Sequence, residues 1–436
     1  MPIDGLANQR DVSRPQDGSR PVHQLFAWLA EGRPVTHGFY LLPDLPKCMS
    51  NVRIAGGGLT HFGNHPERTG RDMFGEAAGM ALSDANVPRE DVEALYYGNF
   101  MGSLSEHQSH QGPLMAEAAG LSCPATRYET ACASSGAAAR EAVKRLEYGD
   151  ADVIAVGGME RMNNMGTAGA TEGLAIAADE LHEVRAGVTF PGAYALMARA
   201  YFQQFGGDRT DLAHVAVKNH ANAVGNETAQ YQQEITVEDA LDAPMISSPL
   251  GLYDSCPISD GASVLILVSE SYADEHGLDA PVAVTGTGQA GDRMALADRE
   301  TFAQTPAAEE AAQKAYQEAD VGPGDVDVAE VHDCFTIAEV MAIEALGFYG
   351  PGEAIGAARR GETTADGDLP INLSGGLKAK GHPVGATGAS QLVELNKLLR
   401  GDHVNSDVVE DATVGVAHNA GGTVASCVVH VLEVVE

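Results

Sequence analysis

From Met49 onward, short apolar runs alternate with longer segments in which apolar residues recur at helical spacing. Runs rich in valine, isoleucine and tyrosine and bounded by glycine are typical of buried strands, and a three-to-four-residue apolar period is typical of amphipathic helices. The first series predicts a strand and glycine turn over 50–63, strands over 92–100 and 151–160, and helices over 72–87, 113–121 and 135–149.

A second series of the same kind fills the C-terminal part of the chain. It predicts strands over 282–291, 326–333, 412–422 and 424–435, and helices over 306–319, 338–348 and 388–401. Strands alternating with helices of this length favour an α/β fold whose sheets are covered on both faces. The repetition indicates an internal duplication into halves at 49–278 and 279–436.

The section 161–249 differs from both series because it is polar and glycine-rich and has only patches of helical pattern. The apolar run within 258–270 then returns to a sheet strand. We therefore expect 161–249 to be a loop domain inserted into the first half, and a place where substrate contacts gather.

Charge and cysteine usage exclude several classes of protein. The net charge is −34, with 61 acidic and 27 basic residues, so the surface should repel nucleic acid and anionic membranes. Such acidity is typical of proteins from a salt-rich cytoplasm, although an ordinary acidic protein also fits. No apolar run is long enough to span a bilayer, no signal-peptide pattern is present, and the six cysteines are scattered without a C-x-x-C pair. We expect a cytoplasmic protein with reduced thiols.

Residues 1–48 differ from the rest of the chain in their charge. Five basic and five acidic residues balance there, so the whole net charge belongs to 49–436. We expect 1–48 to be a disordered or non-native extension, and the working protein to begin near Met49.

Cys132 lies in the stretch YETACASSGAA, where small residues surround the thiol just before a predicted helix. Backbone N–H groups at a helix N-terminus stabilise an anion, so we expect a lowered thiol pKa and an oxyanion hole beside it. The pattern favours a nucleophile, although a buried, unreactive cysteine also fits it.

Two further stretches carry candidate chemistry. In GGLKAKGHPVGATG, His382 lies between Gly381 and Pro383 in a rigid turn, where glycines allow a ligand to approach the backbone. In VAEVHDCFTIAEV, His332 and Cys334 end an apolar strand, the edge at which α/β sheets gather ligands. A structural histidine and a packed thiol are the alternatives for these two stretches.

Five motifs together resemble the thiolase superfamily: CASSG, GGMERM, HDCF, GHPVGATG and HNAGG, in that order. HDCF in place of the commoner N-E-A-F is similar to the sterol-carrier-protein and archaeal-type thiolases. The resemblance runs from about Val52 to the C-terminus. It implies a thiolase fold of the α/β class, in which two duplicated halves form five αβαβα layers with an inserted loop domain.

The resemblance also implies roles for single residues. Cys132 would be the acyl-accepting nucleophile, His382 the base that activates it, His332 the group that holds a water in the oxyanion hole, and Cys334 the second acid/base. Substrates would be coenzyme A thioesters, with no further cofactor and no metal.

Near the C-terminus the chain departs from the common family pattern. Asn419 occupies the position where most thiolases have a catalytic cysteine, and this missing thiol is why the second acid/base role passes to Cys334. Gly421 would keep a backbone role beside the Cys132 amide. His418 remains a rival to Cys334, and Asn419, Gly421 and His418 are together expected in the oxyanion and substrate-binding region.

These assignments predict an acetyl-CoA C-acetyltransferase that works through an acyl-cysteine and supplies isoprenoid or polyester precursors. The alternatives are a thiolase for longer 3-ketoacyl-CoAs, an aldol lyase of side-chain CoA thioesters, and a non-catalytic lipid-transfer or scaffold subunit. By the same resemblance we expect a homodimer or homotetramer and a small zinc-ribbon/OB-fold partner protein.

Overall fold

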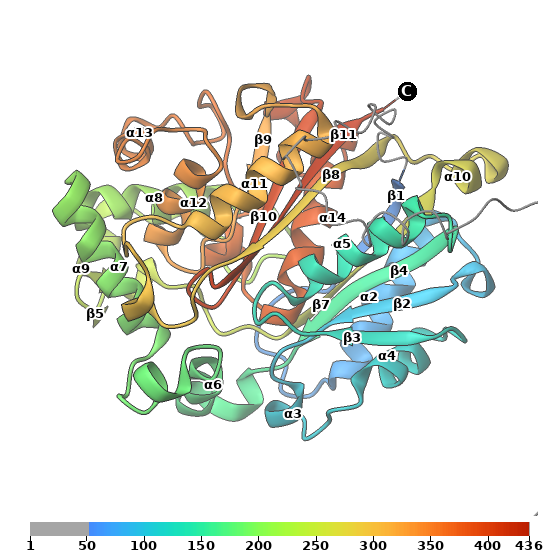
Figure 1. Cartoon of the computed structure of the whole chain (residues 1–436), viewed down its shortest axis with the longest axis horizontal. Helices are drawn as coiled ribbons and strands as arrows, with labels where there is room; N and C mark the ends of the chain where they lie inside the picture. The colour runs from blue at the N-terminus through green and yellow to red at the C-terminus, as the bar shows by residue number, and fades with distance from the viewer. Residues whose placement is uncertain (1–51, 436) are drawn as a thin grey trace, which may run out of the picture. The chain divides into compact units, whose positions relative to one another are not determined.

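The computed structural model describes residues 52–435, and the expected extension at 1–48 lies outside this range. Most strands belong to one mixed sheet, in the order β3-β2-β4-β7-β1-β8-β11-β10-β9 (Figure 1). These strands are β1 (Val52–Leu59), β2 (Ala94–Gly98), β3 (Ala125–Tyr128), β4 (Val153–Glu160), β7 (Gly261–Ser269), β8 (Val282–Gly291), β9 (Val328–Glu330), β10 (Val414–Gly421) and β11 (Ser426–Val434).

The order of strands is the same in the two halves of this sheet. In the first half β2 pairs in parallel with β3 and β4, and β7 pairs antiparallel with β4 and β1. In the second half β9 pairs in parallel with β10, and β11 pairs antiparallel with β10 and β8. A parallel bridge from Ala329 to Ile371 stands where β3 stands in the first half. The two halves join where β1 pairs with β8 at Val52 and Val284.

Each half also packs a helix against glycines of its first strand. A Cβ atom at Gly58 of β1 would overlap the Ala77 carbonyl, and one at Gly288 of β8 would overlap the Ala311 carbonyl. Both helices are alanine-rich at these contacts, so the helix axis can approach the sheet closely. The same device in both halves supports the expected duplication.

Six helices and the two half-sheets form five layers. The outer helices of the first half are α2 (Gly70–Ala85) and α4 (Gln111–Ala119), the central pair is α5 (Ser134–Glu147) and α14 (Thr387–Arg400), and the outer helices of the second half are α11 (Pro306–Ala319) and α12 (Thr336–Ala345). The central pair shares one apolar core with strands of both halves, and each outer pair has a core of its own. This arrangement confirms the predicted αβαβα fold.

Between β4 and β7 the chain leaves the sheet and forms α6 (Gly166–Ala175), α7 (Phe190–Phe205), α8 (Arg209–Asn222), α9 (Val237–Asp242), β5 (Met245–Ser247) and β6 (Leu250–Gly251). Short helices elsewhere are α3 (Gly102–Ser105), α10 (Glu270–His276) and α13 (Ala354–Arg360). Within residues 52–435, no helix is both long enough and apolar enough to cross a membrane.

Candidate active site

A cavity of about 180 Å³ brings the cysteine and histidine motifs together with the insertion between β4 and β7. Cys132, Cys334 and His382 all line it, although they come from three distant parts of the chain. The rest of the lining is largely apolar and comprises Met162, Thr171, Leu174, Ala177, Phe190, Pro191, Ile246, Leu252, Ser255, Cys256, Pro257, Ile258, Phe335 and Gly422.

Cys132 sits in a tight turn just ahead of α5. Ala131 takes a left-handed φ of 51°, and the Ser134 hydroxyl closes the turn by donating to the Ala131 carbonyl and accepting from the Thr130 N–H. Burial raises the pKa of the Cys132 thiol to about 12, although the Gly422 N–H opposes this shift. The expectation of a lowered pKa at the helix N-terminus is therefore wrong, because desolvation of the thiolate exceeds the help from backbone dipoles.

His382 is held from both sides of its turn. Its backbone N–H donates to Ser259 Oγ at 2.9 Å, and its Nδ1 lies 2.8 Å from Thr387 Oγ1. The Thr387 hydroxyl donates its one proton to the Pro383 carbonyl, so the imidazole must donate from Nδ1. Nε2 then carries the lone pair, and burial lowers the pKa of His382 to about 3, which keeps the ring neutral. His382 is thus prepared to accept a proton.

His332 meets His382 across the site. The ring centroids are 4.9 Å apart at an interplanar angle of 84°, and ligand atoms of Cys132, His332 and His382 all lie within 4.8 Å of one another. Burial lowers the pKa of His332 well below its usual range, so this imidazole is also neutral. The structure therefore places one thiol and two neutral imidazoles around a single point.

Cys334 faces the same cavity from the loop between β9 and α12. The Tyr194 hydroxyl lies beside its thiol, and the Tyr194 ring stacks on Phe335 at 4.6 Å. Burial raises the pKa of Cys334 well above its usual range. The protonated thiol is therefore the resting form of this group.

His418, Gly421 and Asn419, which were expected together in the oxyanion and substrate-binding region, make different contacts in the structure. His418 Nδ1 accepts the His332 backbone N–H, and His418 lines a separate, smaller cavity behind the site. Gly421 packs against the Thr130 carbonyl, and its neighbour Gly422 lines the main cavity. Asn419 bonds to the Cys132 carbonyl and to His332.

Sequence reasoning missed Cys256, Thr387 and Gly422. Cys256 lines the main cavity, and its backbone N–H donates to the Cys334 carbonyl. Thr387 and Gly422 lie within or beside motifs that the sequence did single out. Nothing in residue type alone distinguishes them from neighbouring small residues, because their contribution is a hydroxyl or an N–H at one position.

The halves of the chain match known protein families. Residues 52–271 match the thiolase N-terminal domain, and residues 288–434 match the thiolase C-terminal domain-like family. The chain belongs to the thiolase family. This thiolase is 42% identical over 384 residues to the acetyl-CoA acetyltransferase of Methanothermobacter thermautotrophicus, a match that covers 88% of the chain and 99% of the relative. The acetyl-CoA acetyltransferase of Methanocaldococcus jannaschii is 39% identical over 390 residues, with 88% and 99% covered.

More distant relatives share the same fold. Human sterol carrier protein 2 is 28% identical over 87% of this thiolase and 71% of its own length. The solved structure of the Ltp2-ChsH2(DUF35) aldolase superposes with a TM-score of 0.75 at 24% identity, covering 88% of this thiolase and 98% of that chain. At such identity the superposition shows the fold alone.

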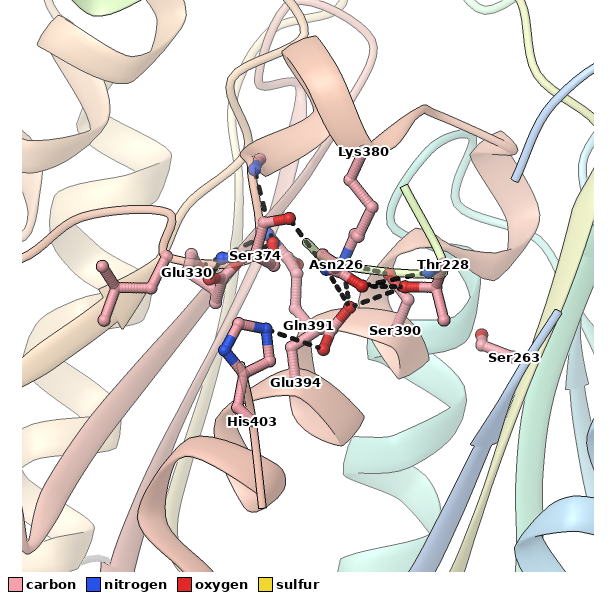
Figure 2. Close-up of polar contacts among 12 residues, drawn as sticks. Asn226, Thr228, Ser263, Glu330, Ser374, Lys380, Ser390, Gln391, Glu394 and His403 are labelled. Carbon is pink, nitrogen blue, oxygen red and sulfur yellow. Dashed lines mark hydrogen bonds and ion pairs between the residues drawn. The ribbon is translucent and has the colours of Figure 1, made fainter. Parts of the chain in front are cut away.

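Figure 2 shows a buried polar network among residues of α14 and of the segments that precede His332 and His382. Lys380, two residues before His382, pairs with Glu394 of α14 at 3.4 Å. Gln391 of α14 donates to the carbonyls of Glu330 and His418, where β9 and β10 stop pairing. Because buried charges of this kind need fixed partners, the network holds both histidine-bearing segments against one helix.

We expect alkylation of Cys132 by iodoacetamide to quicken about tenfold per pH unit between roughly pH 6 and 9, because only the thiolate reacts and its pKa lies above this range. Peptide mass spectrometry of residues 128–140, which contain Cys132 as their one cysteine, measures the rate. A rate that is flat over this range would show a stored thiolate–imidazolium pair and contradict the neutral resting state.

Proposed function

We propose that the protein is an acetyl-CoA C-acetyltransferase, which joins two acetyl-CoA molecules into acetoacetyl-CoA and free coenzyme A and also catalyses the reverse cleavage. The observation that carries the proposal is the convergence of Cys132, His332 and His382 within 4.8 Å at one end of a cavity. The names of the two archaeal relatives support acetyl-CoA as the substrate.

Acyl transfer begins at Cys132. His382 Nε2 takes the thiol proton as the sulfur attacks the thioester carbonyl, and N–H donors around the site stabilise the oxyanion. When the tetrahedral intermediate collapses, the C–S bond to coenzyme A breaks and His382 returns the proton to the leaving thiolate. The acetyl group is then carried on Cys132.

Carbon–carbon bond formation needs a second base. In our proposal the Cys334 thiol first passes its proton to solvent or to His382 Nε2, and the thiolate then removes an α-proton from the second acetyl-CoA. The resulting carbanion attacks the acetyl-cysteine. Cys132 leaves as the thiolate and recovers its proton from solvent or His382. In the cleavage direction Cys334 gives its proton to the departing carbanion, which is the role that its protonated resting form suits.

A second candidate, thiolysis of longer or bulkier 3-ketoacyl-CoAs, is favoured by the apolar walls of the cavity. Phe190, Ile246 and Leu252 line it, and an acetyl group alone would leave much of this surface without a partner. A relative from Thauera aromatica, named benzoylsuccinyl-CoA thiolase subunit BbsB, is 33% identical over 383 residues. Aldol cleavage is a third candidate, on the analogy of the Ltp2-ChsH2(DUF35) aldolase alone.

A chain-length series of 3-ketoacyl-CoAs, assayed by thiolysis, tests the two candidates. We expect the highest kcat/KM with acetoacetyl-CoA, and Ile246→Trp to lower kcat/KM for long chains about tenfold or more with little change for acetoacetyl-CoA. Ile246 is 47% exposed, so the fold should tolerate the larger ring. Leu181→Trp, at a 62% exposed site outside the cavity lining, is the matched control. Preference for long chains would favour the second candidate, and cleavage without a coenzyme A acceptor would favour aldol chemistry.

We further propose that the enzyme works in the cytoplasm as a homodimer or homotetramer with a small partner protein. The name of the Ltp2-ChsH2(DUF35) aldolase, which includes a DUF35 protein, supports a partner of this kind. The charge of −34 supports a salt-rich cytoplasm. Light scattering and co-purification at high salt test these points.

A further inference from the structure

The Cys132 carbonyl fixes the orientation of the Asn419 amide, whose Oδ1 then has no hydrogen-bond partner among the described residues. Its Nδ2 lies 3.2 Å from the Cys132 carbonyl and 3.2 Å from His332 Nδ1. A carbonyl oxygen only accepts hydrogen bonds, so the nitrogen end of the amide must face Cys132. The same NH₂ group then donates its other proton to His332 Nδ1.

The side chain of Asn419 is also locked in place. It is 1% exposed and fills a slot between α5 and α14, where a Cβ at either Gly136 or Gly388 would overlap Asn419 Oδ1. The two glycines let α5 and α14 close tightly on the amide, and this packing together with its two hydrogen bonds holds the side chain against His332.

A nitrogen that accepts cannot also carry the proton. A neutral imidazole has one N–H, so acceptance at His332 Nδ1 places that proton on Nε2. Nε2 of His332 is buried and has no hydrogen-bond partner within residues 52–435. It is therefore a free donor, whereas Nε2 of His382 across the site is an acceptor.

We propose that Asn419 is a positioning residue that holds His332 in the Nε2–H tautomer, so that this imidazole donates to the oxyanion beside Cys132. The inference deepens the proposed function and rests on it for the identity of the oxyanion. It assigns Asn419 a task other than the substrate contact expected from sequence.

The tautomer has a second consequence for the same site. A thiolate and two imidazole nitrogens are a set of donors that Zn²⁺ and Co²⁺ favour, and Cys132, His332 and His382 present such atoms within 4.8 Å. In this tautomer Nε2 has no lone pair for a metal, and the Nδ1 lone pair already accepts from the Asn419 amide. Asn419 therefore keeps His332 from acting as a ligand, and a carboxylate at position 419 would accept from Nδ1–H and release the Nε2 lone pair.

The first test uses the wild-type protein labelled with ¹⁵N-histidine, with His332→Asn to identify the resonances. We expect an unprotonated Nδ1 and a protonated Nε2 for His332, and the reverse assignment would overturn the proposal. The spectrum requires no substrate, so its outcome is independent of whether the enzyme is an acetyltransferase.

The second test is a Co²⁺ titration of Asn419→Asp, followed by the thiolate-to-cobalt absorption band. We expect Co²⁺ to bind the variant about tenfold to a hundredfold more tightly than wild type, and the gain to disappear when His332→Ala is added. Asn396→Asp also replaces a buried amide with a carboxyl, in α14 rather than in β10; it is the matched control and should bind as wild type does. Equal binding by wild type and Asn419→Asp, or a gain that survives His332→Ala, would contradict the proposal.

Discussion

Cys132→Ala is expected to lower thiolysis of acetoacetyl-CoA by about 10⁴-fold or more, because no other atom at the convergence of the two imidazoles can carry the acyl group. The change removes only a sulfur from a buried turn, so thermal unfolding should shift little. Initial rates at saturating substrate, together with an unfolding curve, measure both effects. Cys123→Ser is the matched control, because Cys123 is half-buried and does not line the cavity.

Retention of a tenth or more of wild-type activity by Cys132→Ala would place the nucleophile elsewhere. Cys256 and Cys334 line the same cavity, so they would be the next thiols to replace.

Cys334→Ser is expected to slow exchange of the acetyl-CoA α-protons by about 10²–10⁴-fold while Cys132 is acylated at nearly the wild-type rate. The serine hydroxyl keeps the size of the group and ionises far less readily than a thiol. Deuterium uptake into acetyl-CoA reports proton removal, and rapid-quench labelling of the 128–140 peptide reports acylation.

The opposite result, fast exchange with slow acylation, would remove Cys334 from the acid/base role. His418 would then be the next candidate to replace, because it lines the rear cavity together with His332 and its Nδ1 accepts the His332 backbone N–H. The Nε2 atom of His418 is buried and has no hydrogen-bond partner within the described range, and the same is true of the hydroxyl of Thr305, which lines the same rear cavity.

The long, strongly periodic elements were predictable from sequence, and the edge of the sheet was not. Apolar spacing and terminal glycines identify helices such as α5 and α14, and the buried strand β7, in the sequence. Strand β3 was missed because its four residues are partly exposed and include Arg127. An edge strand of this kind lacks both the continuous apolar run and the clean alternation that identify a strand.

For the candidate site, the motifs indicated which residues take part. They did not indicate the pKa values or the tautomers of those residues. The sequence singled out Cys132, His332, Cys334 and His382. In the structure Cys132, Cys334 and His382 line the main cavity, and His332 lines the smaller rear cavity and lies close to Cys132 and His382. The direction of the Cys132 pKa shift was wrong because burial is not visible from the motif. The tautomer of His332 depends on Asn419, which lies 87 residues away along the chain, so only the folded contact reveals it.

The central claim is that acyl groups pass through Cys132, and trapping the acyl-enzyme tests it most directly. The protein is mixed with acetyl-CoA, quenched in acid within the first turnover, digested with trypsin and analysed by peptide mass spectrometry. We predict one acetyl group on the 128–140 peptide, fragmented to Cys132, which disappears when coenzyme A is added before the quench. An acetyl group found only on the Cys334 peptide, or no acylated peptide during active turnover, would contradict the account.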